Sequence, residues 1–235
     1  MLGLGGIHLL DMVIDNELAS SYGIYMVDRP VIPTAKRKIE YIEVPGRHGA
    51  LTKKGAYEDV PFTLKFNVLE KENIKPLIRR AKPWLLNAKI LYFTDDVVYR
   101  KIKNVEIGDI ANEIEEYGEF EVNFTLDPFE YAEEESFTIS VPGLIFNPGT
   151  EESEPRMWIV AKGTINITIN DSTFQIKDIT SPVVIDSEIL EAYVGTVPFN
   201  HKMIGEFPKF QVGSNKIGWS GTVESIAIRP RWRYI

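Results

Sequence analysis

Apolar side chains recur at every second residue in short runs along most of the chain, and glycine and proline separate these runs. The clearest runs are residues 62–68 (FTLKFNV) and 120–126 (FEVNFTL). A period of two places successive side chains on opposite faces of a strand. The chain also holds 17 Gly and 14 Pro, residues that favour turns. The sequence therefore predicts a mainly β protein.

One segment, about residues 70–86, has a helical period instead. Its apolar residues recur at steps of three and four and form one stripe, which consists of Ile74, Leu77, Ile78, Ala81 and Leu85. Asn73 is a suitable N-cap, and Pro76 is tolerated in a first turn. Pro83 is expected to end or kink the helix, because proline disfavours helical geometry in the residue before it.

The composition changes near residue 130, where an acidic run at 133–135 follows the last alternating strand of the first region. An acidic run resists burial and is typical of a linker. We therefore expect an α+β N-terminal domain over residues 1–135, with several strands, one helix and extended arms. Residues 136–235 lack helical periodicity and hold at least seven short apolar runs, which predicts a C-terminal β-sandwich or jelly roll.

Two details of the strand pattern bear on function. Residues 36–44 (KRKIEYIEV) carry apolar side chains on both faces, so this strand is expected to have partners on both sides. The next residues, 45–51 (PGRHGAL), hold two glycines and a proline and predict an exposed loop. Further along, Asp95-Asp96 and Asn170-Asp171-Ser172 are expected to be hairpin turns.

Charge and composition exclude several classes of protein. The chain has 26 Lys and Arg against 34 Asp and Glu, a formal net charge of −8, which argues against specific nucleic-acid binding. Cysteine is absent, so disulfides and thiolate chemistry are excluded. The apolar residues 1–10 lack a preceding basic residue and end at Asp11, so we expect neither a signal peptide nor a membrane segment.

No catalytic set is evident, and we expect neither an enzyme nor a cofactor or metal site. The segment Gly3-Leu4-Gly5-Gly6 lacks both the third glycine and the preceding strand of a dinucleotide-binding loop. The histidines, His8, His48 and His201, lie far apart in sequence. Paired carboxylates of a glycosidase remain open, since 34 acidic residues make chance pairs easy.

The second half is rich in aromatic residues, among them Trp158, Trp219 and Trp232. Such rings form the core of a small sandwich, or they stack against sugars. Trp158 and Trp219 are the candidate sugar contacts. A basic stripe of Arg229, Arg231 and Arg233 is expected on one strand face, where pairing with local carboxylates is the simpler interpretation.

Several short motifs, taken in order, resemble the distal tail protein (Dit) family of bacteriophages with long, non-contractile tails. In the first half these are 42–49 (IEVPGRHG), Leu51, Gly55, Tyr57, Phe62, the single helix with Trp84-Leu85, 91–93 (LYF) with Asp95-Asp96, and 120–129 (FEVNFTLDPF). In the second half they are 147–150 (NPGT), Pro155, Asp186, Phe207-Pro208, 213–215 (GSN), 218–221 (GWSG) and 228–233 (IRPRWR).

The resemblance implies a structural virion protein rather than an enzyme. Members of this family form a hexameric ring that joins the tail tube to the tail tip, together with the tape-measure protein and tail-tip proteins. The expected location is the virion tail tip, after assembly in the bacterial cytoplasm. By the same likeness, the extended segments around residues 24–44 and the loop at 45–57 would reach neighbouring subunits. The expected interface residues are Tyr41, Pro45, Gly46, Arg47, Gly49, Leu51 and Tyr57.

The C-terminal domains of this family resemble galectins or carbohydrate-binding modules. No added sugar-binding domain is evident in the second half, which weakens the case for a dedicated receptor-binding role. The alternative interpretation is a carbohydrate-binding protein that contacts cell-wall sugars of the host.

Overall fold

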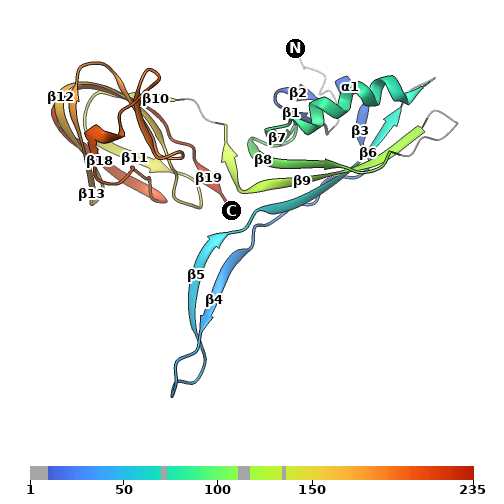
Figure 1. Cartoon of the computed structure of the whole chain (residues 1–235), viewed down its shortest axis with the longest axis horizontal. Helices are drawn as coiled ribbons and strands as arrows, with labels where there is room; N and C mark the ends of the chain where they lie inside the picture. The colour runs from blue at the N-terminus through green and yellow to red at the C-terminus, as the bar shows by residue number, and fades with distance from the viewer. Residues whose placement is uncertain (1–9, 70–72, 111–116, 134–135) are drawn as a thin grey trace, which may run out of the picture. The chain divides into compact units, whose positions relative to one another are not determined.

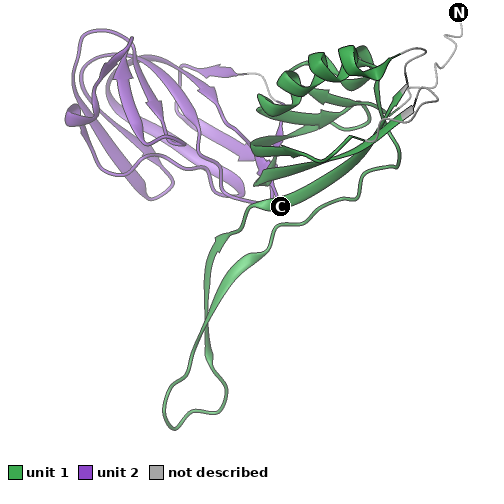
Figure 2. Ribbon diagram, turned by 45° about the vertical axis from the view of Figure 1, so that its right-hand side comes forward, with its two compact units in different colours: residues 1–130, 235 green, residues 131–234 purple. Residues whose placement is uncertain are grey.

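The computed structural model describes residues 10–69, 73–110, 117–133 and 136–235. The chain divides into two compact units, unit 1 with residues 1–130 and Ile235, and unit 2 with residues 131–234 (Figure 2). The expected domain junction lay at residue 135, and the division falls five residues earlier, inside strand β9 (Tyr117–Ala132). Strands dominate both units, as the alternating pattern predicts.

Unit 1 is built on a sheet with the strand order β2-β1-β7-β8-β9-β6-β3. Its neighbouring strands β6 (Val60–Leu69) and β9 align Phe62 with Phe124 and Phe66 with Phe120, so the two alternating runs bury the same face. The other strands and the short 3-10 helix η1 are β1 (Met12–Ile14), β2 (Glu17–Leu18), η1 (Ala19–Tyr22), β3 (Ile24–Met26), β7 (Ile90–Phe93) and β8 (Val98–Ile107). The Asp95-Asp96 turn joins β7 to β8 as predicted.

Helix α1 (Ile74–Leu86) covers the apolar face of this sheet with its buried residues Ile74, Ile78, Ala81 and Leu85 (Figure 1). Asn73 caps it, because its side chain accepts a hydrogen bond from the Lys75 N–H at 3.0 Å. The helix ends at Leu86, the last residue of the predicted range. Pro83 lies inside it, so the prediction that Pro83 ends the helix is wrong. Asn87 stabilises the last turn by donating backbone and side-chain N–H groups to the Pro83 carbonyl at 3.2 and 2.7 Å.

Strands β4 (Arg37–Ile42) and β5 (Leu51–Tyr57) form a two-stranded sheet of their own. We call the hairpin of residues 37–57 the arm; Figure 1 shows it as a long ribbon extending from the β6 end of unit 1. The prediction that residues 36–44 have strand partners on both sides is wrong, because β4 pairs with β5 alone among the described strands. The apolar residues on its two faces are exposed rather than buried within the chain.

Unit 2 consists of strands that curl around a second apolar core. Its main path is β10-β18-β12-β14-β15-β16, with β11, β13 and β17 paired at its sides. The turn at Asn170-Asp171 joins β12 to β13 as predicted, with Asn170 at a φ of 53°. The bounds are β10 (Phe137–Ile139), β11 (Gly143–Asn147), β12 (Arg156–Ile169), β13 (Ser172–Ile179), β14 (Val183–Asp186), β15 (Glu191–Val194), β16 (Val197–Pro198), η2 (Asn200–Lys202), β17 (Met203–Ile204), β18 (Gly213–Arg229) and β19 (Arg233–Tyr234).

A buried asparagine explains the motif at residues 147–150. Asn147 donates to the carbonyls of Glu151 and Phe210 at 3.1 and 3.2 Å and accepts from the Gly149 N–H at 2.8 Å. A Cβ on Gly149 would lie 2.4 Å from the Arg233 carbonyl oxygen, so only glycine fits there. These residues therefore position the backbone of unit 2 rather than a ligand.

Candidate assembly site

The arm exposes apolar side chains that nothing in the described chain covers. Tyr41 is 68% exposed and Leu51 is 40% exposed, and the pairing of β4 with β5 places Leu51 opposite Ile42. A two-stranded hairpin without a third strand or a packed face is marginally stable in water. Each arm strand pairs with one neighbour, so each leaves one edge of backbone N–H and C=O groups unpaired. The arm thus offers both an apolar surface and strand edges to another molecule.

The root of the arm is fixed to unit 1 through Tyr57. Its ring contacts Phe129 edge to face, with 5.7 Å between the ring centroids. The guanidinium of Arg37 lies over the other side of the hairpin, 5.0 Å from the Tyr57 centroid, and its Nε donates to the Gly55 carbonyl at 2.9 Å. The arm is therefore anchored where it leaves the sheet.

The tip of the arm is the exposed loop at residues 45–50. Gly46 and Gly49 adopt φ values of 80° and 75°, which L side chains rarely adopt, and the space around both is open. Except for Tyr57, every residue expected at the interface lies on the exposed part of the arm: Tyr41 and Leu51 in its strands and Pro45, Gly46, Arg47 and Gly49 in its tip. Their contact with another subunit stays a prediction.

A second extended segment, residues 27–36, lies next to the root of the arm. Between Pro30 and Pro33 it presents Val31 and Ile32, which are 73% and 90% exposed. The Arg100 side chain holds the segment by donating to the Pro33 carbonyl at 3.3 Å. A cavity of about 460 Å³ separates the segment from β7 and the start of β8. This stretch belongs to the extended segments expected to reach neighbouring subunits, but Val31 and Ile32 are not among the expected interface residues; their signal in the sequence is an apolar pair between two prolines.

Neither a protein-family model nor a curated protein sequence matches this chain. The solved structures do: the crystal structure of the SPP1 Dit protein, described as a hub of the adsorption apparatus in phages that infect Gram-positive bacteria, superposes with a TM-score of 0.68. The alignment covers 97% of this chain and 100% of that chain at 12% sequence identity. This chain has the Dit fold. The resemblance to the distal tail family is thereby confirmed for the fold.

The baseplate of phage P2 in its activated conformation with Ca is also similar, with a TM-score of 0.49 and 11% identity over 94% of this chain and 98% of that chain.

Within this Dit fold, the tryptophans of unit 2 are engaged by other side chains. Trp232 is buried at 4% exposure and packs on Phe210 with 5.5 Å between ring centroids. Trp219 is half-buried and packs against the same core. Trp158 is half-buried, and the Arg156 guanidinium lies 4.7 Å from its ring centroid. The role of Trp158 and Trp219 as sugar contacts stays a prediction.

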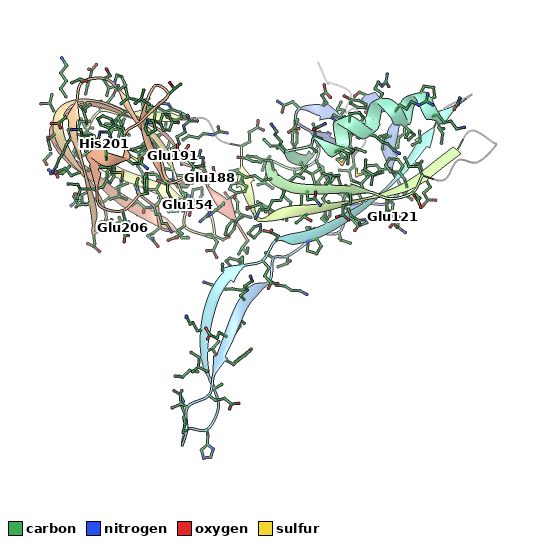
Figure 3. All side chains as sticks on the ribbon, in the orientation of Figure 1. Glu121, Glu154, Glu188, Glu191, His201 and Glu206 are labelled. Carbon is green, nitrogen blue, oxygen red and sulfur yellow. The ribbon has the colours of Figure 1, made fainter. Side chains whose placement is uncertain are left out.

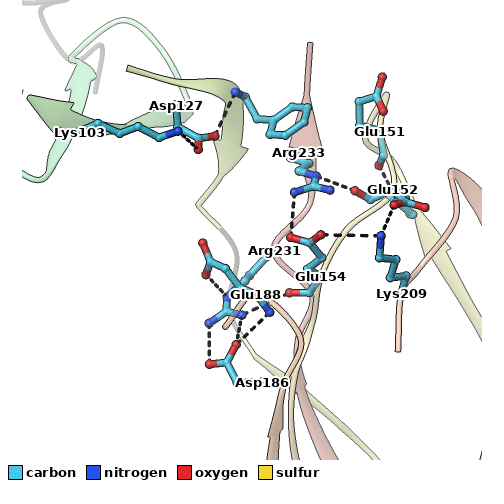
Figure 4. A network of polar contacts seen from close by, with 12 residues as sticks. Lys103, Asp127, Glu151, Glu152, Glu154, Asp186, Glu188, Lys209, Arg231 and Arg233 are labelled. Atoms are coloured by element: carbon cyan, nitrogen blue, oxygen red, sulfur yellow. Dashed lines mark hydrogen bonds and ion pairs between the residues drawn. The ribbon is translucent and has the colours of Figure 1, made fainter. Parts of the chain in front are cut away.

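Two of the three C-terminal arginines, Arg231 and Arg233, pair with carboxylates of unit 2, as the simpler interpretation predicts (Figure 4). Arg231 forms two hydrogen bonds with Asp186, at 2.6 and 3.0 Å, and Arg233 contacts Glu154 at 3.1 Å. Their placement on one strand face is wrong, because β18 ends at Arg229 and Arg231 has a φ of 56° outside any strand.

Asp186 is the buried centre of this network. Burial alone would raise its pKa, but the hydrogen bonds and charge of Arg231 outweigh it, with help from the Glu188 N–H and the charge of Arg156. The pKa of Asp186 therefore lies below its ordinary value. The two guanidinium groups stabilise the charged form of the Asp186 carboxylate, and this attraction also stabilises the fold around it.

The two described histidines lie in different units of the chain. His48 is exposed on the arm tip, and His201 lies in unit 2 against Phe199, with 5.7 Å between ring centroids (Figure 3). His8 and the segment 3–6 lie outside the described residues. In the ranges that the structure describes, no group of His, Asp and Glu is suited to hold a metal ion. No helix in those ranges is long and apolar enough to cross a membrane.

Proposed function

We propose that this chain is a structural, non-enzymatic component of a phage tail tip. It would act as a hub whose unit 1 forms a hexameric ring between the tail tube and the receptor-binding apparatus. The Dit fold over nearly the whole chain supports this assignment. The expected partners are further copies of the chain, the tail tube protein, the tape-measure protein and a tail-tip protein.

The arm is the observation that carries the proposal. A closed ring of identical subunits uses a heterologous interface, in which each subunit presents two different, complementary surfaces. The exposed strand edges and apolar residues of the arm supply one such surface, since an added strand binds through backbone hydrogen bonds. The cavity beside Val31 and Ile32 is a candidate for part of the other surface.

The test is the oligomeric state of the full chain, measured by light scattering and negative-stain electron microscopy over a range of concentrations. The proposal expects rings of six copies, alone or when the tail tube protein is added. A matched variant in which Asn-Gly replaces residues 43–50 shortens the arm and leaves the rest of unit 1 unchanged. A chain that stays monomeric and binds no tail protein under all these conditions would overturn the proposal.

A further inference from the structure

Helix α1 carries a row of exposed cations along one flank. Lys75, Arg79 and Lys82 follow each other at steps of four and three residues, which places them on one stripe of the helix. None of the three forms an ion pair with a residue that the structure describes. The sequence from 73 to 94 contains five Lys and Arg and no acidic residue, in a chain whose net charge is −8. Among the residues that the structure describes, no carboxylate therefore neutralises this concentration of positive charge.

The same flank borders a groove. Its floor consists of Ile74, Ile78 and Ile110, and its rim consists of Lys75, Arg79 and Lys82. The volume is about 320 Å³, enough for a few side chains. The α1 groove, as we call it, therefore combines an apolar floor with a cationic rim.

We propose that the α1 groove binds an extended acidic segment of another tail protein. With a helical rise of about 1.5 Å per residue, Lys75 and Arg79 are separated by about 6 Å along the axis. Carboxylates on alternate residues of an extended chain are about 6.6 Å apart. A segment with acidic residues at alternate positions matches the Lys75–Arg79 step, and the shorter Arg79–Lys82 step, about 4.5 Å, is within reach of the long Lys82 side chain. Consecutive side chains of an extended chain point to opposite sides, so the residue between two carboxylates points away from the cations.

The chemistry of the groove favours a peptide over nucleic acid. Binding to a phosphate backbone depends on neutralising many charges, and three cations on an acidic protein are few for that purpose. Ile74 and Ile78 are already buried in the core of unit 1, so the apolar surface that remains in the groove is small; it suits an aliphatic side chain better than a phosphate. The identity of the partner as a tail protein rests on the proposed function, but the site is on α1 rather than the arm, so binding there does not depend on ring formation.

The experiment is a titration of the ¹⁵N-labelled full chain, followed by NMR, with the peptide acetyl-Glu-Ile-Glu-Val-Glu-amide. Its matched control is the same peptide with Gln in place of each Glu. Two triple variants remove the rim charges, Lys75→Gln/Arg79→Gln/Lys82→Gln and Lys75→Glu/Arg79→Glu/Lys82→Glu. A third variant, Lys162→Gln/Lys177→Gln/Lys216→Gln, removes the same number of exposed cations elsewhere. Circular dichroism confirms that each variant is folded.

The proposal expects the Glu peptide to shift amide signals of residues 74–82 and 110, and expects the Gln peptide to shift them far less. Since exposed ion pairs contribute little each, the loss of all three is expected to weaken binding by about tenfold. The third variant is expected to bind as the unmodified chain does. Unchanged binding by both rim variants, or equal binding of both peptides, would overturn the proposal. It is also overturned if a short DNA duplex displaces the Glu peptide, or if the same signals shift with protein concentration alone, which would indicate a second copy.

Discussion

Arg37 stacks on Tyr57 at the point where the arm leaves unit 1, with its guanidinium 5.0 Å from the ring centroid. The same ring meets Phe129 edge to face. These contacts join an otherwise exposed hairpin to the sheet that carries it. We therefore expect the direction in which the arm leaves unit 1 to depend on this joint.

Tyr57→Ala should loosen the arm without unfolding unit 1. An aromatic pair contributes about 0.5–1.5 kcal/mol beyond its buried area, so we expect a loss of about 1 kcal/mol in the free energy of unfolding. Hydrogen exchange should become faster in residues 37–57 and stay unchanged in β6 and β9. Tyr57→Phe keeps the ring and serves as the control. Equal protection of the arm in the alanine variant would show that Tyr57 does not anchor it.

The acid stability of unit 2 should depend on Asp186. Its pKa is lowered in the folded protein, so its charged form stabilises the fold above the ordinary value of about 3.9, and this stabilisation is lost as the pH falls through the folded pKa. Asp186→Asn leaves Arg231 without its buried partner and should cost about 3 kcal/mol at pH 7. Denaturant unfolding between pH 7 and pH 2 should show a flatter acid limb in the variant. Some slope should remain, because hydrogen bonding by Lys209 also lowers the pKa of Glu152. An unchanged acid limb would contradict this assignment.

Substitution of Trp232 should destabilise unit 2 more than substitution of Trp158, because Trp232 is buried and Trp158 is half-buried. Trp232→Ala removes a buried ring from the core and should cost about 3–5 kcal/mol. Trp158→Ala should cost far less, because its half-buried ring packs mainly under Arg156. Thermal unfolding compares the two variants. Glycan-array binding of the folded Trp158→Ala protein then tests the sugar contact, and binding that the variant loses would support the carbohydrate-binding alternative.

Gly149→Ala should destabilise unit 2 although it adds a single methyl group. The new Cβ would meet the Arg233 carbonyl oxygen at 2.4 Å, and that oxygen accepts a hydrogen bond from the Thr150 N–H at 3.1 Å. The clash can be relieved only if the backbone moves, so we expect the free energy of unfolding, measured by denaturant unfolding, to fall by about 1–3 kcal/mol. Gly143→Ala, at an open position, is the control.

The periodic parts of the fold could be predicted from the sequence. Phe62–Phe124 and Phe66–Phe120 bury the face that alternation assigned to them, and α1 buries its predicted stripe. An alternating pattern indicates which face of a strand is buried, however, and does not indicate which residues cover that face. For residues 36–44 the pattern was correct for a strand, but the described chain supplies a single strand neighbour, and the apolar side chains on both faces are exposed.

The candidate site was harder to predict for a related reason. The tip loop was evident from Pro45, Gly46 and Gly49, whose residue types mark turns. The anchor at Tyr57 depends on Phe129, which lies 72 residues away in sequence, and the α1 groove depends on Ile110 beside the helix. Contacts between distant segments leave no periodic signal in a single sequence.

The central claim is that the arm holds copies of this chain together, and light scattering of the full chain beside the Tyr41→Glu/Leu51→Glu variant tests it most directly. Both substituted residues are exposed, so the free energy of unfolding should change by less than about 0.5 kcal/mol each. We predict rings of the unmodified chain, with or without the tail tube protein, and monomers of the variant under the same conditions. Rings formed equally well by the variant would contradict the account.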